Sequence, residues 1–163
     1  MFQRVVVIAS FALFGFVVSA PPGIAQQPSP SPCSLLQPSE IKAALHKRTV
    51  SAGDLTTAPD GSESVCEWIV MLDPRHGYGF TLHVRPGFND RTFKQQRQSA
   101  LGTKRTIVKL GDDAYSQRST PSAPIPSLDV WVLHGSVVIG LEAAHSVGTK
   151  SLVGLGRLVL ARL

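Results

Sequence analysis

The sequence is poor in the residues that most often carry chemistry in a protein site. It has two cysteines in 163 residues. Neither has a second cysteine or a histidine at the spacing of a zinc-ligand pair. The five histidines are scattered, and Glu142-Ala-Ala-His145 lacks the first histidine of a zincin helix. We therefore expect no metal site and no cofactor.

Motifs of hydrolases and of nucleotide-binding enzymes are missing as well. No Gly-x-Ser-x-Gly segment occurs, and Gly154-Leu-Gly156 lacks the third glycine, the lysine and the preceding strand of a phosphate-binding loop. Asp112 and Asp113 are adjacent, and adjacent side chains of an extended segment point to opposite sides. We predict a turn there, in which one of the two carboxylates caps the backbone. These observations favour a protein that is not an enzyme.

Charge is modest in this chain. Sixteen basic and eleven acidic residues give a formal net charge of +5. That balance favours solubility and loose attraction to anionic surfaces, but it is far from the composition of a nucleic-acid-binding protein. We expect no nucleic-acid partner.

The uncharged run Val5–Val18 follows Arg4 and is too short to span a bilayer comfortably. Gly23 and Ala25 occupy the −3 and −1 positions of a cleavage site, so we predict a signal peptide over residues 1–25. The protein is then exported, to the periplasm or the extracellular space, with no stable membrane anchor after cleavage. An uncleaved anchor is the alternative.

The segment 26–32, with three prolines and two serines, is typical of an extended linker. Residues 33–163 are long enough for one domain with its own core. In an exported protein, Cys33 and Cys66 are more simply explained by one disulfide than by a metal site. Two unpaired buried thiols are the alternative.

Three helices are predicted. The first begins at Pro38, because Gln37 and Glu40 have the spacing of a capping box and Leu36 with Ile41 that of a hydrophobic staple. The second covers Asn89–Leu101. The third covers Ser146–Leu163, with an apolar stripe formed by Leu152, Leu155, Val159 and Leu163.

Strands are predicted between these helices. The run Val65–Leu72 is almost wholly apolar and predicts a strand buried on both faces. Residues 80–85 alternate between apolar and polar, as in a half-exposed strand. Residues 128–133 and 137–141 predict a hairpin, a short strand ends near Arg118, and residues 53–64 and 119–127 predict loops. The connections are too short for parallel crossovers, so we predict an α+β domain with about three helices packed on a mainly antiparallel sheet.

Three segments together resemble a family of small exported bacterial proteins of unknown function, many of them lipoproteins. They are Cys33-Ser-Leu-Leu-Gln-Pro-Ser-Glu-Ile41, Cys66-Glu-Trp68 and Leu110-Gly-Asp-Asp-Ala-Tyr115. The resemblance extends over nearly all of residues 33–163 and implies the disulfide and the α+β fold. Two departures are Gln37, where the family usually has threonine, and the absence of a lipobox. The resemblance implies no catalytic residue.

Basic residues gather in one part of the sequence, between residues 85 and 109. We predict from them a patch that contacts an acidic protein or an anionic envelope component; a solvated helix face is the alternative. The patch consists of Arg91, Lys94, Arg97, Lys104, Arg105 and Lys109. The sequence thus favours a non-catalytic binding or interaction domain of the cell envelope. An enzyme with a site assembled from dispersed residues, or a structural accessory of an envelope complex, are the alternatives.

Overall fold

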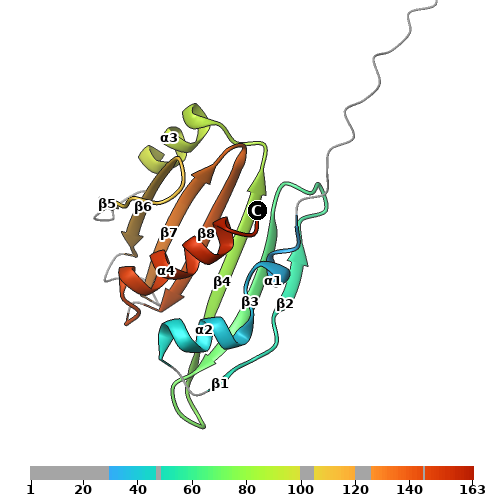
Figure 1. Ribbon diagram of the computed structural model, residues 1–163, viewed down its shortest axis with the longest axis vertical. Helices are drawn as coiled ribbons and strands as arrows, with labels where there is room; N and C mark the ends of the chain where they lie inside the picture. Colours follow the sequence, from blue (N-terminus) through green and yellow to red (C-terminus); the bar gives the residue numbers. More distant parts are fainter. Residues whose placement is uncertain (1–29, 47–48, 100–104, 120–125, 145) are drawn as a thin grey trace, which may run out of the picture.

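An antiparallel sheet organises the chain (Figure 1). The structure is a computed structural model that describes residues 30–46, 49–99, 105–119, 126–144 and 146–163. Within these ranges the chain forms a single α+β domain of eight strands and four helices, which confirms the predicted fold class. The strands are β1 (Thr49–Val50), β2 (Asp54–Thr57), β3 (Ser64–Met71), β4 (Gly77–Pro86), β5 (Arg105–Ile107), β6 (Asp113–Arg118), β7 (Ser127–His134) and β8 (Val137–Ala144). The helices are α1 (Pro32–Leu35), α2 (Pro38–Leu45), α3 (Asp90–Ser99) and α4 (Thr149–Leu160).

Two hairpins form the middle of the sheet. The β3–β4 hairpin and the predicted β7–β8 hairpin lie side by side because β4 pairs with β8. The strand order is β1-β3-β4-β8-β7-β6-β5. β1 and β2 pair with the same edge of β3: β2 pairs with its first half and β1 with its end. Strands far apart in the sequence therefore become neighbours at the centre of the sheet.

The first predicted helix begins where the capping signals place it. Gln37 is the N-cap of α2, and its backbone N–H donates to the carboxylate of Glu40 at 2.9 Å. Pro38 is the first helical residue, where its missing N–H is not needed. Leu36 and Ile41 are both fully buried, as expected for a staple. The helix ends at His46, which has a left-handed backbone conformation.

One face of the sheet carries the main core. Helices α1, α2 and α4 cover this face (Figure 1), and the apolar residues of the strands alternate toward them. Phe80, Leu82 and Val84 of β4 point to this side, as the alternation predicted. The predicted disulfide is confirmed: Cys33 in α1 is bonded to Cys66 in β3, with their Cα atoms 5.2 Å apart. It fixes the start of the domain to the sheet.

The last helix follows its predicted stripe for most of its length. Leu152, Leu155 and Val159 are fully buried, but α4 ends at Leu160, and Leu163 is exposed. The inclusion of Leu163 in the stripe was therefore wrong. Beyond the helix, the guanidinium of Arg162 donates to the carbonyl of Leu35 at 2.7 Å and forms an ion pair with Glu40. The end of the chain is thereby tied to α1 and α2.

Two strand predictions were wrong in detail. Strand β3 is buried on one face only, because Glu67 and Ile69 are exposed on the side that α1, α2 and α4 leave uncovered. Residues 53–64 were predicted as a loop, but β2 lies within them and pairs with β3. All four residues of β2 are exposed, so no apolar alternation marks this edge strand in the sequence.

The second helix begins as predicted. The N–H of Thr92 donates to the side chain of Asn89 at 3.0 Å, and Phe93 is fully buried. Its predicted end at Leu101 lies outside the described residues, as do the signal peptide over residues 1–25 and most of the linker 26–32. Pro32, the last residue of that linker, already belongs to α1. No helix in the described ranges is long and apolar enough to cross a membrane.

Candidate functional site

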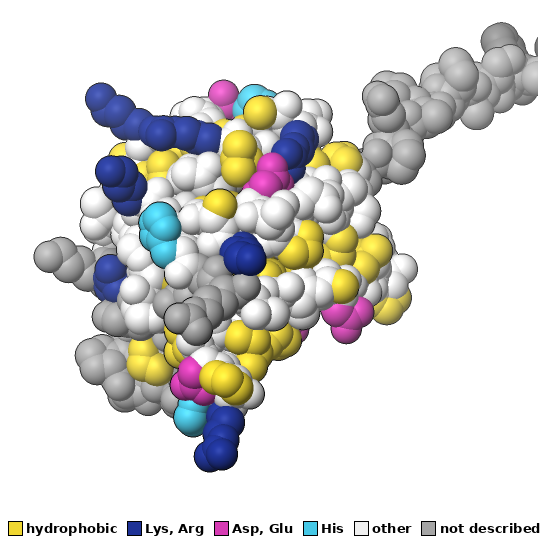
Figure 2. Space-filling model, turned by 60° about the horizontal axis from the view of Figure 1, so that its bottom comes forward, with side chains coloured by type: hydrophobic (Ala, Val, Ile, Leu, Met, Phe, Trp, Pro, Cys, Tyr) yellow, Lys and Arg dark blue, Asp and Glu magenta, His cyan; other side chains and the backbone are white. Residues whose placement is uncertain are grey.

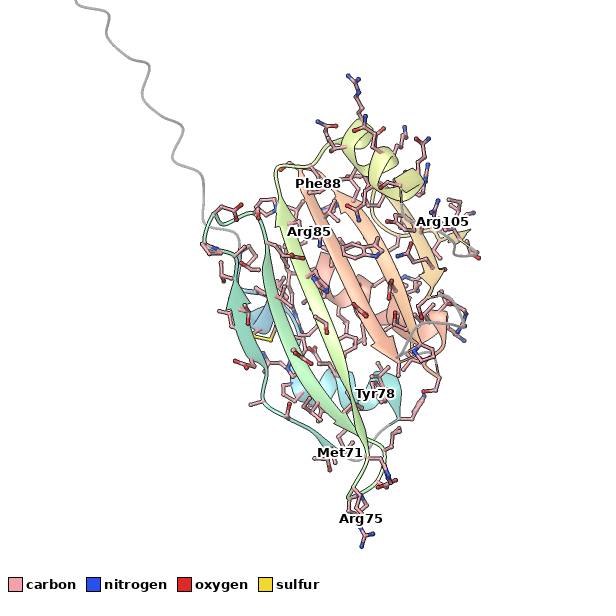
Figure 3. The ribbon with its side chains drawn as sticks, turned by 180° about the vertical axis from the view of Figure 1, so that it is seen from behind. Met71, Arg75, Tyr78, Arg85, Phe88 and Arg105 are labelled. Atoms are coloured by element: carbon pink, nitrogen blue, oxygen red, sulfur yellow. A yellow bond between two sulfur atoms is a disulfide. The ribbon has the colours of Figure 1, made fainter. Side chains whose placement is uncertain are left out.

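The second face of the sheet is the candidate site. We call it the open face: the side opposite α1, α2 and α4, seen in Figure 3 with α3 at one end. The ladder registers place alternate residues of seven neighbouring strands on this side. Its polar, charged and aromatic members are Asp54, Glu67, Thr81, His83, Arg85, Arg105, Tyr115, Gln117, Asp129, Trp131 and Glu142.

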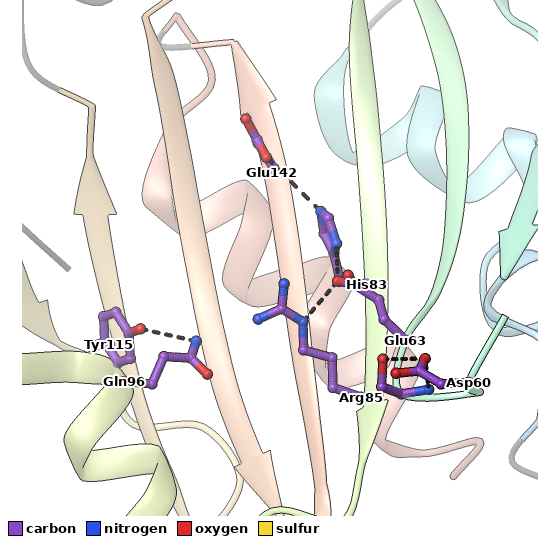
Figure 4. A network of polar contacts seen from close by, with 8 residues as sticks. Asp60, Glu63, His83, Arg85, Gln96, Tyr115 and Glu142 are labelled. Carbon is purple, nitrogen blue, oxygen red and sulfur yellow. Dashed lines mark hydrogen bonds and ion pairs between the residues drawn. The ribbon is translucent and has the colours of Figure 1, made fainter. Parts of the chain in front are cut away.

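A small apolar cluster closes one end of the open face. Phe93 of α3 packs on Tyr115, with ring centroids 5.5 Å apart, and on Leu133 and Val138 of the sheet. The side chain of Gln96, from the same helix, lies 3.4 Å from the hydroxyl of Tyr115 (Figure 4). Helix α3 is thus fixed to the sheet through this cluster and through the Arg97–Asp113 ion pair, and the rest of the face extends away from it.

Glu63 holds two basic side chains of β4 in place. One of its carboxylate oxygens lies 2.7 Å from Nδ1 of His83 and accepts from Nε of Arg85 at 2.7 Å (Figure 4). Burial opposes ionisation of Glu63, but the hydrogen bonds from Arg85 and His83 hold its pKa below the usual range. Because an ionised carboxylate only accepts, the contact assigns the Nδ1 proton to His83.

That assignment determines what the other ring nitrogen of His83 can do. In the neutral ring Nε2 is then an acceptor, and it lies 3.9 Å from the carboxylate of Glu142 on β8. Nε2 is buried and has no hydrogen-bond partner among the described residues. An unpaired ring nitrogen and a carboxyl group therefore face each other at the centre of the open face.

Trp131 lies next to this pair. Its ring lies 5.5 Å from that of His83, and the guanidinium carbon of Arg85 is 4.9 Å from the Trp131 ring centroid. Gly140, opposite Trp131 on β8, makes room for the ring, because a Cβ there would lie 2.5 Å from it. The sheet therefore already binds one guanidinium by a cation–π contact.

Four carboxylates form a row across the strands. Asp54 of β2 pairs with Glu67 of β3, which pairs with Thr81 of β4; Thr81 pairs with Glu142 of β8, which pairs with Asp129 of β7. We call Asp54, Glu67, Glu142 and Asp129 the carboxylate row. Glu142, in the row, lies 3.9 Å from Nε2 of His83, which forms an ion pair with it when the ring is protonated.

The two members of the row on β8 and β7, Glu142 and Asp129, are held in an unfavourable environment for charge. Burial raises the pKa of Asp129, although Gln117 and Ser127 donate to its carboxylate at 3.1 Å. Burial also raises the pKa of Glu142, and the nearby negative charges of Asp129 and Glu67 raise it further. A protonated His83 would offset part of this cost, because its charge favours the ionised form of both carboxyls.

Unpaired buried polar atoms collect on this face. Five side-chain atoms in the described ranges are buried without a hydrogen-bond partner, and four of them belong to the open face or to its contact with α3. These four are His83 Nε2, Gln96 Oε1, Arg105 Nε and Gln117 Oε1. Buried polar atoms are normally hydrogen-bonded, so this concentration marks the open face as the place where a ligand has groups to satisfy.

The predicted basic patch is only partly assembled. Arg91, Lys94 and Lys109 are exposed, and Lys94 is bonded to Asp90 at 3.0 Å. Arg97 is half-buried and donates to both carboxylate oxygens of Asp113 at 3.1 Å. Arg105 is half-buried at the β5 edge of the open face (Figure 3). Lys104 lies outside the described residues. Binding of an acidic partner by this patch stays a prediction.

The bottom of the molecule, which faces the viewer in Figure 2, has no cluster of charged side chains comparable to the carboxylate row among its described residues. Figure 2 shows Lys and Arg side chains standing apart from one another among hydrophobic and uncharged ones. A hollow of about 520 Å³ lies at the turn before β6, lined only by the single segment 107–114. Its two aspartates are already engaged, because Asp112 accepts from the N–H of Gly135 at 2.6 Å and Asp113 pairs with Arg97. The prediction that one aspartate caps the backbone is thereby confirmed.

No group of three or more His, Cys, Asp or Glu side chains in the described ranges could hold a metal ion. No family model, no curated protein and no solved structure matches the chain. The resemblance of its three segments to a family of exported bacterial proteins therefore stays a prediction.

Proposed function

We propose that the chain is an exported, non-catalytic binding domain that contacts its ligand or partner through the open face of the sheet. The observation that carries the proposal is the set of unpaired buried polar atoms on that face, above all His83 Nε2 opposite Glu142. The supporting residues are fixed on strands, by ladder hydrogen bonds and by Glu63, so the face is preorganised.

Export of the domain rests on two observations. The disulfide between Cys33 and Cys66 is consistent with an oxidising compartment such as the periplasm or the extracellular space. The signal peptide predicted over residues 1–25 supports the same compartment.

A capture experiment tests the use of the open face. Thr81 lies between Glu67 and Glu142 in the cross-strand row, so Thr81→Arg places a large side chain in the middle of the face. Ala43→Arg, on the exposed side of α2, is the matched control on the helix-covered face. Both variants should keep a folded sheet, as measured by circular dichroism and thermal unfolding.

The proposal predicts that wild-type protein and Ala43→Arg retain the same components from the native envelope fraction and that Thr81→Arg loses them. Equal retention by Thr81→Arg would contradict it. Loss by Ala43→Arg alone would instead assign the contact to the helix-covered face.

One observation favours a second candidate, an enzyme that uses acid–base chemistry. Asp129 and Glu142 have raised pKa values and lie beside His83, an arrangement that can hold and transfer a proton. In a binding domain Glu142→Gln, which preserves the shape but removes the proton-transferring group, changes affinity alone, because there is no turnover to lose. An enzyme loses turnover by orders of magnitude in the same variant, so turnover of a bound component distinguishes the two.

A further inference from the structure

We propose that the open face binds an extended polypeptide segment of a partner protein, with lysine or arginine at alternate positions, laid across the strands along the carboxylate row. This inference rests on the proposed function and names the chemistry of its ligand. It follows from the length of the row, from the four carboxylates in it and from two unpaired atoms beside it that can accept a hydrogen bond.

The length of the row suits an extended peptide. From β2 to β7 there are four steps between neighbouring strands, in the order β2, β3, β4, β8 and β7. At about 4.8 Å a step, the row is about 19 Å long. An extended chain covers that distance in about six residues, and its alternate side chains, about 7 Å apart, point to the same side. Three cationic side chains can therefore reach the row at once.

The charge of the row selects a cation. The protein as a whole has a formal net charge of +5, yet four of its eleven acidic residues lie in this single row. Glu67 also leans over β4, since a Cβ at Gly79 would lie 2.8 Å from its carboxylate. A cationic side chain placed there lowers the repulsion between Glu67 and Glu142 that the fold itself leaves in place.

Two of the unpaired atoms beside the row can accept a hydrogen bond, whereas Arg105 Nε, at the β5 end beyond Gln117, is a donor. Gln117 donates its side-chain N–H to Asp129, which leaves its buried Oε1 as an acceptor without a partner. His83 Nε2 is a second unpaired acceptor, next to Glu142. Ammonium and guanidinium groups are donors only, so they match both positions.

Aromatic side chains support the same ligand class. Trp131, Tyr115 and His83 form the next cross-strand row, toward α3. The guanidinium of Arg85 already lies over Trp131, so this face accommodates a planar cation against its aromatic surface. Figure 3 shows Arg85 on this face, between the carboxylate row and α3.

The probe for the test is a dye-labelled synthetic hexapeptide with lysine at alternate positions and serine between them. Fluorescence anisotropy of this peptide with the exported protein, in low salt, measures the dissociation constant. The comparison ligands are the same peptide with glutamate in place of lysine, and spermidine as an unlabelled competitor. The variants are Glu67→Gln and Glu142→Gln, with Asp90→Asn on exposed α3 as a control of equal charge change.

We expect the lysine peptide to bind and the glutamate peptide not to bind. Each row variant should raise the dissociation constant about fivefold, the effect of losing one contact charge in water. Asp90→Asn should leave it unchanged, and added salt should weaken binding.

Two results would overturn the inference. One is that the lysine peptide binds no better than the glutamate peptide, so that charge does not decide binding. The same conclusion follows if Asp90→Asn weakens binding of the lysine peptide as much as Glu142→Gln does. The other is that spermidine displaces the labelled lysine peptide when the two are present at equal concentration. That result would make the ligand a small polyamine. If the lysine peptide fails but Thr81→Arg still abolishes capture from the envelope fraction, the proposed function stands and only the ligand class is wrong.

Discussion

Asp129 and Glu142 lie directly opposite each other on β7 and β8, so the sheet holds two carboxylates side by side on its open face. Directly opposed like charges destabilise a sheet, and burial adds to that cost here. The helix-covered face shows the opposite design, with apolar residues packed throughout. The open face therefore retains an unfavourable arrangement that a stable sheet does not need, as expected of a binding surface.

The first prediction concerns the pH dependence of that arrangement. Because the folded state raises the pKa of Asp129, its charged form destabilises the fold, and that penalty is present above the raised pKa. Asp129→Asn should therefore increase the free energy of unfolding at neutral pH. The gain should shrink as the pH falls through the raised pKa and vanish below about 3.9, where the carboxyl is protonated in both states. Denaturant unfolding across this pH range measures it; a loss of stability at pH 7 would contradict the prediction.

Glu63 should behave in the opposite way. Its lowered pKa means that its ionised form stabilises the fold above its ordinary pKa, and that this contribution is lost as the pH falls through the lowered value. Glu63→Gln should cost about 2 kcal/mol at neutral pH, since it weakens charge-assisted hydrogen bonds to His83 and Arg85. Glu67 follows Cys66 directly and is exposed on the other face of β3, so Glu67→Gln should change stability by less than about 0.5 kcal/mol. Urea unfolding of both variants tests the contrast.

Two glycines provide a matched pair of alanine substitutions. At Gly140 a new Cβ would meet the ring of Trp131 at 2.5 Å, so Gly140→Ala should displace the ring and cost about 1–3 kcal/mol. At Gly154 in α4 nothing lies within 4 Å, and Gly154→Ala should add about 0.5–1 kcal/mol through helix propensity. In thermal unfolding, the midpoint should fall for Gly140→Ala and rise for Gly154→Ala. Equal shifts at the two positions would contradict the packing of Trp131 against Gly140.

The disulfide should contribute a large share of the stability. Cys33 and Cys66 are 33 residues apart in sequence, and closing a loop of that length contributes about 4 kcal/mol by the chain-entropy model. Replacing both cysteines by serine should lower the unfolding free energy by about that amount. Mass spectrometry of the protein without reductant should show no free thiol. Two alkylated cysteines would contradict the pairing.

Much of the fold could be predicted because local signals and burial agree there. Gln37, Pro38 and Glu40 define the start of α2 without help from the rest of the chain, and the alternation in β4 correctly assigned Phe80 and Leu82 to the core. Strand β2 could not be predicted, since its four exposed residues lack any periodic apolar pattern and form a strand only because they pair with β3.

The candidate site could not be predicted because it depends on strand order. Glu67, Glu142 and Asp129 come from three strands, and only the β4–β8 pairing brings them into one row. A partial signal was present: the polar positions of residues 80–85 alternate with apolar ones, which assigns these polar side chains to an uncovered face. The basic residues near 91–109 were easier to recognise because they lie close together in the sequence.

Carboxyl footprinting tests the central claim, that the open face is the binding surface, most directly. The protein is treated with a carbodiimide and an amine, with and without the material it captures from the envelope fraction, and each modified residue is located by mass spectrometry. The account predicts that modification of Glu67 and Glu142 falls in the complex and that modification of Asp60 and Asp73, in exposed turns, does not change. Unchanged modification of Glu67 and Glu142 in a saturated complex would contradict it.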